Sequence, residues 1–266
     1  MEPRVFSKGY NILTEQRDGP GEMLMDIGVY VFSAGEKKIF FDLANESAFL
    51  LLNGSVTIEW GGGQGRKEEA ERGSLFDEMP VCLHVPAGES VSITAHTEGC
   101  EVLVQRTANP ARFEPVYYPK ESIKNVFLGA DNMQGCAKRV LRDIFNYGNA
   151  PYSNMVLGED IHLPGRWSSY PPHHHPQPEV YYYRFDKPQG FGVSIIGDAA
   201  AVIMDNHISA IPGGFCHPQV AAPGYAMYYV WMIRHLDGNP WTSRIDDPAH
   251  TWLHDKNAAL WEGPEA

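Results

Sequence analysis

Residues 168–179 read SSYPPHHHPQPE and bring a run of histidines close to a glutamate. Successive side chains of an extended strand point to opposite faces, so His173 and His175 point the same way and His174 points the other way. Glu179 is also odd-numbered, so its side chain lies on the same face as those of His173 and His175 if the strand resumes in register. Two imidazole nitrogens and one carboxylate on a common face are typical of a transition-metal site that lacks one ligand. We therefore predict that His173, His175 and Glu179 bind a metal ion.

A second motif supplies the missing ligand. Residues 212–217 read PGGFCH, which puts His217 after a tight turn. A His-x-His-x3-Glu motif followed by a Pro-x-Gly turn and a histidine resembles the paired motifs of the cupin superfamily. A solvated loop is the alternative interpretation of the histidine run, and the second motif favours the metal. Because Cys216 would point away from the ligand face, no thiolate is expected. The predicted cofactor is one divalent transition metal per chain, with Mn, Zn, Fe, Ni and Co all admissible.

Short segments rich in Val, Ile, Tyr and Phe recur along the chain, separated by turn residues. The chain has 26 Gly and 20 Pro in 266 residues, and this punctuation is typical of an all-β sandwich or barrel. The segments expected to form strands are 29–32, 38–41, 55–60, 90–95, 101–105, 139–145, 154–162, 179–185, 191–196, 209–211 and 226–233. A short helix is expected at 121–127.

The two halves of the chain carry related turns. Residues 85–91 read VPAGESV, a Pro-x-Gly turn like the one at residue 212, but Val91 stands where the histidine would be. No His-x-His motif precedes it. We therefore predict a bicupin of two double-stranded β-helix (jelly-roll) barrels: residues 1–115 without metal ligands, and residues 116–266 with the metal site. One irregular β domain is the alternative, but each half has its own set of strands and turns.

The charge balance limits the partners. With 21 basic and 33 acidic residues the net charge is −12, which repels a phosphate backbone, so no nucleic acid is expected. No apolar run reaches the ~18 residues of a membrane span, and the start of the chain lacks the apolar stretch of a signal peptide. We therefore expect a cytoplasmic protein with reduced cysteines and no membrane partner. A homo-oligomer is compatible with the exposed sheet edges of jelly rolls.

Longer motifs in the second half make the resemblance specific. They are WSSYPPH at 167–173, YY at 181–182, PQGF at 188–191, HP at 217–218, PGY at 223–225, YY at 228–229 and DPAHTW at 247–252. In this order they resemble the 5-deoxy-glucuronate isomerase family of myo-inositol catabolism, which is related to 5-keto-4-deoxyuronate isomerase. The resemblance implies a bicupin fold. It also implies the aldose–ketose isomerisation of 5-deoxy-D-glucuronate, a small-molecule sugar acid, to 5-dehydro-2-deoxy-D-gluconate.

Such a reaction needs a base near the two reacting carbons. Alternation from Glu179 places Tyr181 and Tyr183 on the ligand face. Either tyrosine is therefore a candidate proton carrier, and Glu179 is another if it loosens from the metal. Packing inside a barrel is the alternative role of each tyrosine.

The substrate carboxylate needs a cation, and the sugar hydroxyls need polar partners. Arg166 and Arg184 are the candidate cations, and Arg184 also matches the family position in some members. Alternation places Arg184 outside the barrel, where a strand-face ion pair is the alternative role. Gln189 and Tyr229 are candidates for binding the substrate, although Gln189 could equally be a hairpin residue.

Three other functions remain open. An iron dioxygenase of the cupin type would have an apolar pocket and depend on oxygen, whereas Ser168, Ser169 and Gln189 favour a sugar. A sugar-binding or storage bicupin would have no metal ligands, which the intact second set argues against. An isomerase acting on a different uronate would keep the same residues and chemistry.

Overall fold

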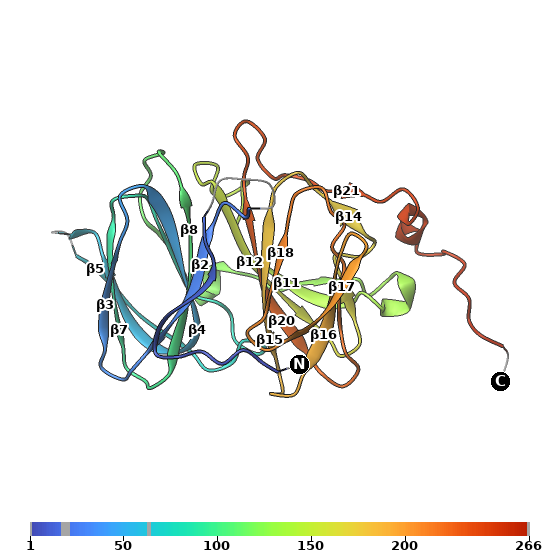
Figure 1. Ribbon diagram of the computed structural model, residues 1–266, viewed down its shortest axis with the longest axis horizontal. Helices are drawn as coiled ribbons and strands as arrows, with labels where there is room; N and C mark the ends of the chain where they lie inside the picture. Colours follow the sequence, from blue (N-terminus) through green and yellow to red (C-terminus); the bar gives the residue numbers. More distant parts are fainter. Residues whose placement is uncertain (1, 17–21, 63–64, 265–266) are drawn as a thin grey trace.

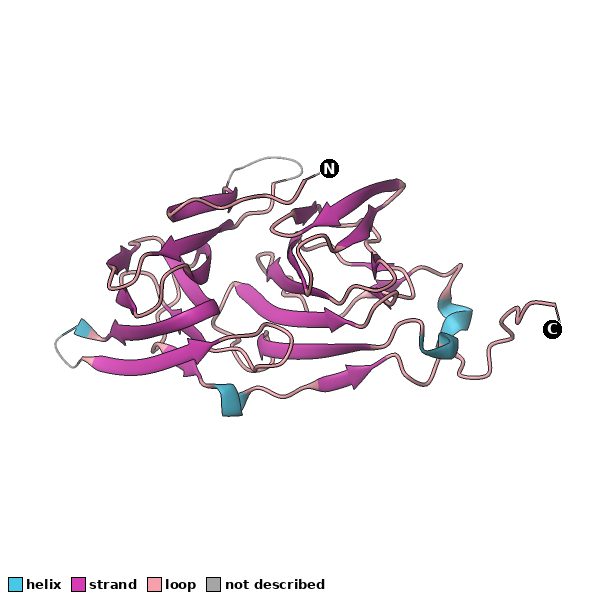
Figure 2. Cartoon of the chain, turned by 90° about the horizontal axis from the view of Figure 1, so that it is seen from below, coloured by secondary structure: helices cyan, strands magenta, loops and turns pink. Residues whose placement is uncertain are grey.

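The computed structural model describes residues 2–16, 22–62 and 65–264, and nearly all of its regular structure is β-strand (Figures 1 and 2). The all-β prediction is confirmed. Short 3₁₀ turns occur at η2 (Lys120–Ser122), η3 (Met133–Gly135) and η4 (Thr251–His254). Within these ranges, no helix has the length and apolar character required to cross a membrane.

Among the described residues, the strands of the first half form one nine-stranded sheet, here called the N-terminal lobe. Its main path runs β1 (Gly9–Thr14), β2 (Asp26–Phe32), β8 (Cys100–Ala108), β4 (Asn45–Trp60), β6 (Cys82–Val85) and β9 (Val116–Tyr118). The remaining strands are β3 (Lys37–Phe41), β5 (Arg66–Arg72) and β7 (Ser90–Ala95). The first part of β4 pairs with β6 and β8, and its second part pairs with β5 and β7. Buried apolar side chains, among them Phe49, Val56 and Ile93, pack together inside this lobe.

The strands of the second half form the C-terminal lobe (Figure 1). In the described part of the chain its largest sheet has six strands: β10 (Val126–Leu128), β11 (Arg139–Phe145), β12 (Met155–His162), β20 (Met227–Arg234), β15 (Glu179–Phe185) and β18 (Ile208–Ile211). A smaller sheet contains β13 (Trp167–Ser168), β19 (Gln219–Ala221), β16 (Phe191–Ile196) and β17 (Ala199–Met204). Finally, β14 (His173–His174) pairs with β21 (Ile245–Asp246).

A large apolar cluster joins the two lobes. It combines buried side chains from both, such as Leu50 of β4, Leu157 of β12 and Met232 of β20. Each fully buried side chain of this kind contributes about 1.5–3 kcal/mol. Because side chains alternate along a strand, the six-stranded sheet packs one face on the N-terminal lobe and turns its other face into its own lobe.

A buried ion network crosses the same contact. The Glu159 carboxylate on β12 accepts hydrogen bonds from Arg72 of the N-terminal lobe at 2.7 and 2.9 Å. It also accepts one from Arg142 at 3.2 Å and one from the Tyr228 hydroxyl at 2.8 Å. All four side chains are almost fully buried. The two lobes are therefore held together by paired charges as well as by apolar packing.

The helix expected at 121–127 is wrong. The chain makes the 3₁₀ turn η2 and then enters β10, where Val126 and Phe127 pair with Leu141 and Val140 of β11. A helix this short is marginal by itself. The strand ladder instead gives the same backbone groups partners.

The predicted division after residue 115 falls next to β9. This three-residue strand pairs with β6, so the residues just beyond the predicted boundary belong to the sheet of the N-terminal lobe. The division of the chain into two barrels at this position stays a prediction.

Candidate metal centre

Ligand atoms from the two sequence motifs converge inside the C-terminal lobe. The atoms offered by His175, Glu179 and His217 all lie within 4.8 Å of one another. Nε2 of His175 and Nε2 of His217 are each 3.2 Å from Oε2 of Glu179. The ring centroid of His173 is 5.2 Å from that of His217. All four side chains are buried. The structure therefore brings the predicted ligands His175, Glu179 and His217 together, and the ring of His173 lies beside that of His217.

Main-chain carbonyls orient the three imidazoles. Each ring places its Nδ1 near the carbonyl oxygen of the residue two positions away: His173 on Pro171 (3.0 Å), His175 on Gln177 (3.0 Å) and His217 on Phe215 (2.9 Å). A carbonyl oxygen only accepts, so Nδ1 is the donor in each ring. This arrangement leaves Nε2 for a metal and fixes the direction in which it points.

The charge states also suit a cation. Burial opposes ionisation of Glu179, but hydrogen bonds with His175 and His217 outweigh it and lower its pKa to about 2. Burial, with the nearby charges of His217 and Arg244, lowers the pKa of His173 to about 3. Burial also works against a charge on His217, but the hydrogen bond with Glu179 raises its pKa. A charged carboxylate among imidazole nitrogens is a donor set that fits a divalent transition metal.

Gly213 lets the second motif approach the first. A Cβ atom at Gly213 would lie 1.8 Å from the carbonyl oxygen of Pro176. The next residue, Gly214, has φ +92° and donates its N–H to the carbonyl of His175 at 2.8 Å. The turn therefore packs directly on the histidine segment and carries His217 to Glu179.

The four predicted ligands line a cavity of about 200 Å³. Aromatic rings from β15, β20 and the segment after β20 form much of the remaining wall: Tyr181, Tyr229, Trp231 and Trp241. The other charged side chains at the cavity are Arg139, Asp143, Asp160 and Arg244. A small polar molecule that carries a negative charge would find both stacking surfaces and cations here.

Tyr181 and Tyr229, two of the predicted site residues, face this cavity. Their rings stack with centroids 4.3 Å apart. The Tyr181 hydroxyl is 3.0 Å from the Ser169 hydroxyl, and the Tyr229 hydroxyl is 2.8 Å from that of Ser168. The paired serines of the SSYPPH motif therefore position the two tyrosines.

Other predicted residues lie elsewhere. Tyr183 is buried, and its hydroxyl donates to Oε1 of Gln219 at 2.6 Å and lies 2.9 Å from that of Ser209. Gln189 is exposed in the connection between β15 and β16, and Arg166 is half-buried before β13. None of these three predicted residues lines the cavity, so their position does not support contact with a substrate there.

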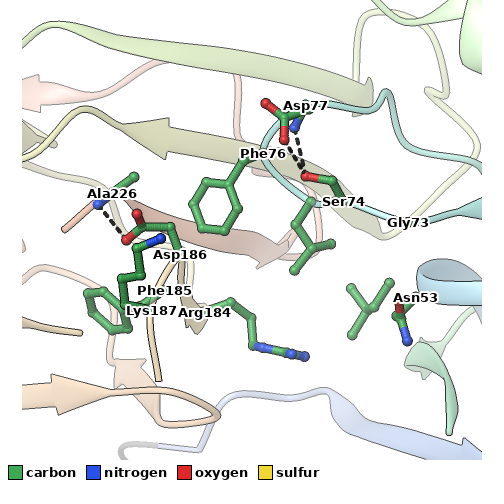
Figure 3. A pocket seen from close by; sticks show the side chains of 12 residues that line it. Asn53, Gly73, Ser74, Phe76, Asp77, Arg184, Phe185, Asp186, Lys187 and Ala226 are labelled. Carbon is green, nitrogen blue, oxygen red and sulfur yellow. Dashed lines mark hydrogen bonds between the residues drawn. The ribbon is translucent and has the colours of Figure 1, made fainter. Parts of the chain in front are cut away.

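Arg184 lies in a different cavity, of about 530 Å³, between the two lobes (Figure 3). Its Nη1 is 2.6 Å from Oε2 of Glu101, and its Nε is 3.3 Å from Oδ2 of Asp205. Alternation along β15 turns this side chain away from the ligand face, and the ion pair with Glu101 connects the lobes. This position does not support the predicted role of Arg184 in binding a substrate carboxylate at the metal centre.

Sequence reasoning missed Arg139, Asp160 and Arg244. Asp160 and His162 are two residues apart in β12, so both side chains point into the C-terminal lobe, where Nε2 of His162 lies 3.8 Å from Oδ1 of Asp160. The alternation of β12 could have identified Asp160. Arg139 and Arg244 come from β11 and from the segment before β21, and no local motif marks either one.

A family model connects this geometry with known proteins. The model described as the KduI/IolB family matches residues 1–253. The chain belongs to this family. This KduI/IolB chain is 24% identical to a protein of Geobacillus kaustophilus (strain HTA426) named 5-deoxy-glucuronate isomerase, over 94% of this chain and 92% of that protein. It is 25% identical to a protein of the same name from Shouchella clausii (strain KSM-K16), over 74% of this chain and 79% of that one.

Solved structures share the fold. An IolB-like protein from Salmonella typhimurium LT2 superposes with a TM-score of 0.82 at 17% identity, covering 96% of this chain and 98% of that one. An oxalate decarboxylase from Lactobacillus farciminis gives a TM-score of 0.65 at 13% identity, covering 91% and 85%. The KduI/IolB chain thus has the all-β, cupin-like fold that its motifs predict.

Proposed function

We propose that this protein is a metal-dependent aldose–ketose isomerase that converts 5-deoxy-D-glucuronate to 5-dehydro-2-deoxy-D-gluconate. The observation that carries the proposal is the KduI/IolB match over residues 1–253, together with curated relatives named 5-deoxy-glucuronate isomerase. The buried ligand cluster at the cavity supports it independently, because this reaction class uses a bound cation and a shielded site.

The metal ligands in this proposal are His173, His175, Glu179 and His217. A divalent ion held by them would supply Lewis acidity that stabilises negative charge developing on substrate oxygens. Imidazole and carboxylate donors admit Mn, Fe, Co, Ni or Zn. Metal analysis of the purified protein, followed by removal and replacement of the metal, tests which ion restores activity.

Arg244 is the proposed partner of the substrate carboxylate. Its side chain is 38% exposed, and its Nε lies 3.0 Å from Oδ1 of Asp246. The pairing β14–β21 sets His173 opposite Asp246, which places Arg244 close to the ligand strand. Arg244 therefore lies at the cavity with its guanidinium partly open to solvent, where a carboxylate can reach it. Arg139 is the more buried cation and is committed to Asp160.

The cavity also separates the alternatives. An apolar dioxygenase substrate would not pair with the partly exposed guanidinium of Arg244 at the cavity, so Arg244 favours a sugar acid. An isomerase of a different uronate remains the second candidate, because a carboxylate-binding arginine is suited to any uronate and the relatives are only 24–25% identical.

A proton NMR time course in heavy water tests the function. Metal-loaded wild type and the His217→Ala variant are each given 5-deoxy-D-glucuronate, with His96→Ala, in the N-terminal lobe, as the control. We expect wild type and the control to consume the aldehyde signal and form the keto acid, and His217→Ala to do neither. Absence of turnover by metal-loaded wild type would contradict the named substrate. Other uronates, and then oxygen consumption, would be tested next.

A further inference from the structure

The proposed isomerisation requires a group that takes a proton from one carbon and returns it to the neighbouring carbon. This inference rests on the proposed function. Two of the predicted proton carriers at the cavity are poorly suited to the task. Glu179 is engaged by His175 and His217 at 3.2 Å each. Burial raises the pKa of Tyr181 well above its usual range, which keeps its hydroxyl protonated.

Asp160 lines the same cavity, and hydrogen bonds hold one of its two carboxylate oxygens. Its Oδ2 accepts a hydrogen bond from Nε of Arg139 at 3.0 Å and one from the Tyr229 hydroxyl at 3.3 Å. Its Oδ1 is buried and has no hydrogen-bond partner among the described residues. Nε2 of His162 lies 3.8 Å from Oδ1. A buried polar atom without a partner is unusual in a folded protein and calls for an explanation.

The environment of Asp160 suits proton exchange near neutral pH. Burial raises the pKa of the carboxyl to about 7, against the opposing effect of Arg139 and the hydrogen bonds that it accepts. The titratable groups that face it are Arg139 from β11, Tyr229 from β20 and His162 from its own strand. Burial, with the charge of Arg139, lowers the pKa of His162 to about 3, so that ring is neutral. A carboxyl that is partly protonated at the working pH can both accept and donate a proton.

We propose that Asp160 is the catalytic proton carrier and that its carboxyl group takes the C2 hydrogen of the bound aldose as a proton and returns it to C1. In the first step the C2–H bond breaks, its electron pair forms the C1=C2 double bond, and the carbonyl π electrons move to O1. The proton of the C2 hydroxyl then passes to O1. In the last step Asp160 protonates C1, and O2 becomes the carbonyl oxygen. No oxidant or reductant is consumed.

The test compares wild type with Asp160→Asn, which keeps the shape of the side chain but cannot carry the proton. Asp198→Asn, in the exposed turn between β16 and β17, is the matched control. All three proteins are loaded with metal and given 5-deoxy-D-glucuronate. We expect Asp160→Asn to bind metal and substrate as wild type does but to lose about 100-fold or more in kcat. We also expect the acid limb of the wild-type pH profile to disappear. The control keeps wild-type kcat.

A kcat for Asp160→Asn within about tenfold of wild type overturns the role of Asp160 and leaves the isomerase intact. Wild type that converts no uronate overturns the function and the inference with it. If Asp160→Asn does not fold, the measurement uses wild type alone with substrate deuterated at C2. Partial loss of the label to water supports a proton carrier. Full retention of the label at C1 shows a hydride shift and overturns the proposal.

Discussion

The direction of each proposed ligand imidazole is set by its own main chain. Because Nδ1 of His173, His175 and His217 is held by a carbonyl two residues away, Nε2 of each ring is left for a metal, and Nε2 of His175 and of His217 lies 3.2 Å from the Glu179 carboxylate. In the proposed metal centre, preorganisation of this kind would lower the entropic cost of binding an ion.

Loss of His217 should remove the metal. We expect His217→Ala to lower metal affinity by at least about 100-fold, more than changes that only reorient a ligand. Metal content after dialysis and calorimetric titration with the metal measure the effect. His96→Ala, at a surface position of the N-terminal lobe, is the control and should keep its metal. Equal metal content in the two variants would show that His217 is not a ligand.

Loss of Arg244 should affect substrate binding. A hydrogen bond between charged groups contributes about 1.5–3 kcal/mol, so Arg244→Ala should raise KM by roughly 10- to 150-fold with a smaller change in kcat. Steady-state kinetics measure the changes in KM and in kcat separately. Arg66→Ala on β5 of the N-terminal lobe serves as the control for loss of a surface charge. An unchanged KM for Arg244→Ala would mean that Arg244 does not bind the substrate carboxylate and that Arg139 is the remaining candidate.

The turn between β18 and β19 sets how closely the two motifs approach. A methyl group at Gly213 would collide with the carbonyl of Pro176, so Gly213→Ala must displace one of the two segments. We expect Gly213→Ala to weaken metal binding while the strands stay folded, as measured by metal titration together with circular dichroism.

Gly99 provides the matched control. It has φ +70° and no atom within 4 Å of an added Cβ. Gly99→Ala should therefore lose about 1–2 kcal/mol of stability from backbone strain and leave metal binding unchanged. Equal effects of the two substitutions on metal affinity would mean that the close approach at Gly213 does not position His217.

Strand periodicity made much of this architecture predictable. The alternation within β15 anticipates that Glu179 and Tyr181 share the cavity and that Arg184 points away from it. The two-residue spacing of His173 and His175 works in the same way. Both inferences need only local geometry, because successive side chains of a strand alternate whatever surrounds it.

The site features that could not be predicted from the sequence depend on contacts between distant segments. Arg139 and Arg244 reach the cavity from β11 and from beside β21, and neither position is marked by a motif. Tyr183 has the parity of Tyr181, but its hydroxyl is bonded to Gln219 and Ser209. Alternation predicts which face of the sheet a side chain lies on. Whether that side chain reaches the cavity depends on the partner strands and the loops around it.

The contact between the lobes should be sensitive to Glu159. Removing one partner of a buried ion pair costs about 3–5 kcal/mol, because the remaining charge stays buried without compensation. We expect Glu159→Gln to lower the free energy of unfolding by this amount, since it leaves both Arg72 and Arg142 without their carboxylate. Denaturant unfolding measures the change.

Glu59→Gln is the control, because Glu59 forms an exposed pair with Lys37. Exposed ion pairs contribute about 0–1 kcal/mol, so the control should change little. Similar losses for Glu159→Gln and Glu59→Gln would mean that apolar packing alone holds the lobes together.

Glu159 and Asp160 are neighbours in β12, and one faces the other lobe while the other faces the cavity. A single deleted or inserted residue upstream in this strand would exchange them. The Glu159 carboxylate, which pairs with two buried arginines, would then face the cavity, and Asp160 would face the contact between the lobes. A change in the length of β12 would therefore harm the contact between the lobes and the proposed chemistry together. Natural variation in this family should therefore spare the residue count of β12 even where it changes the residues.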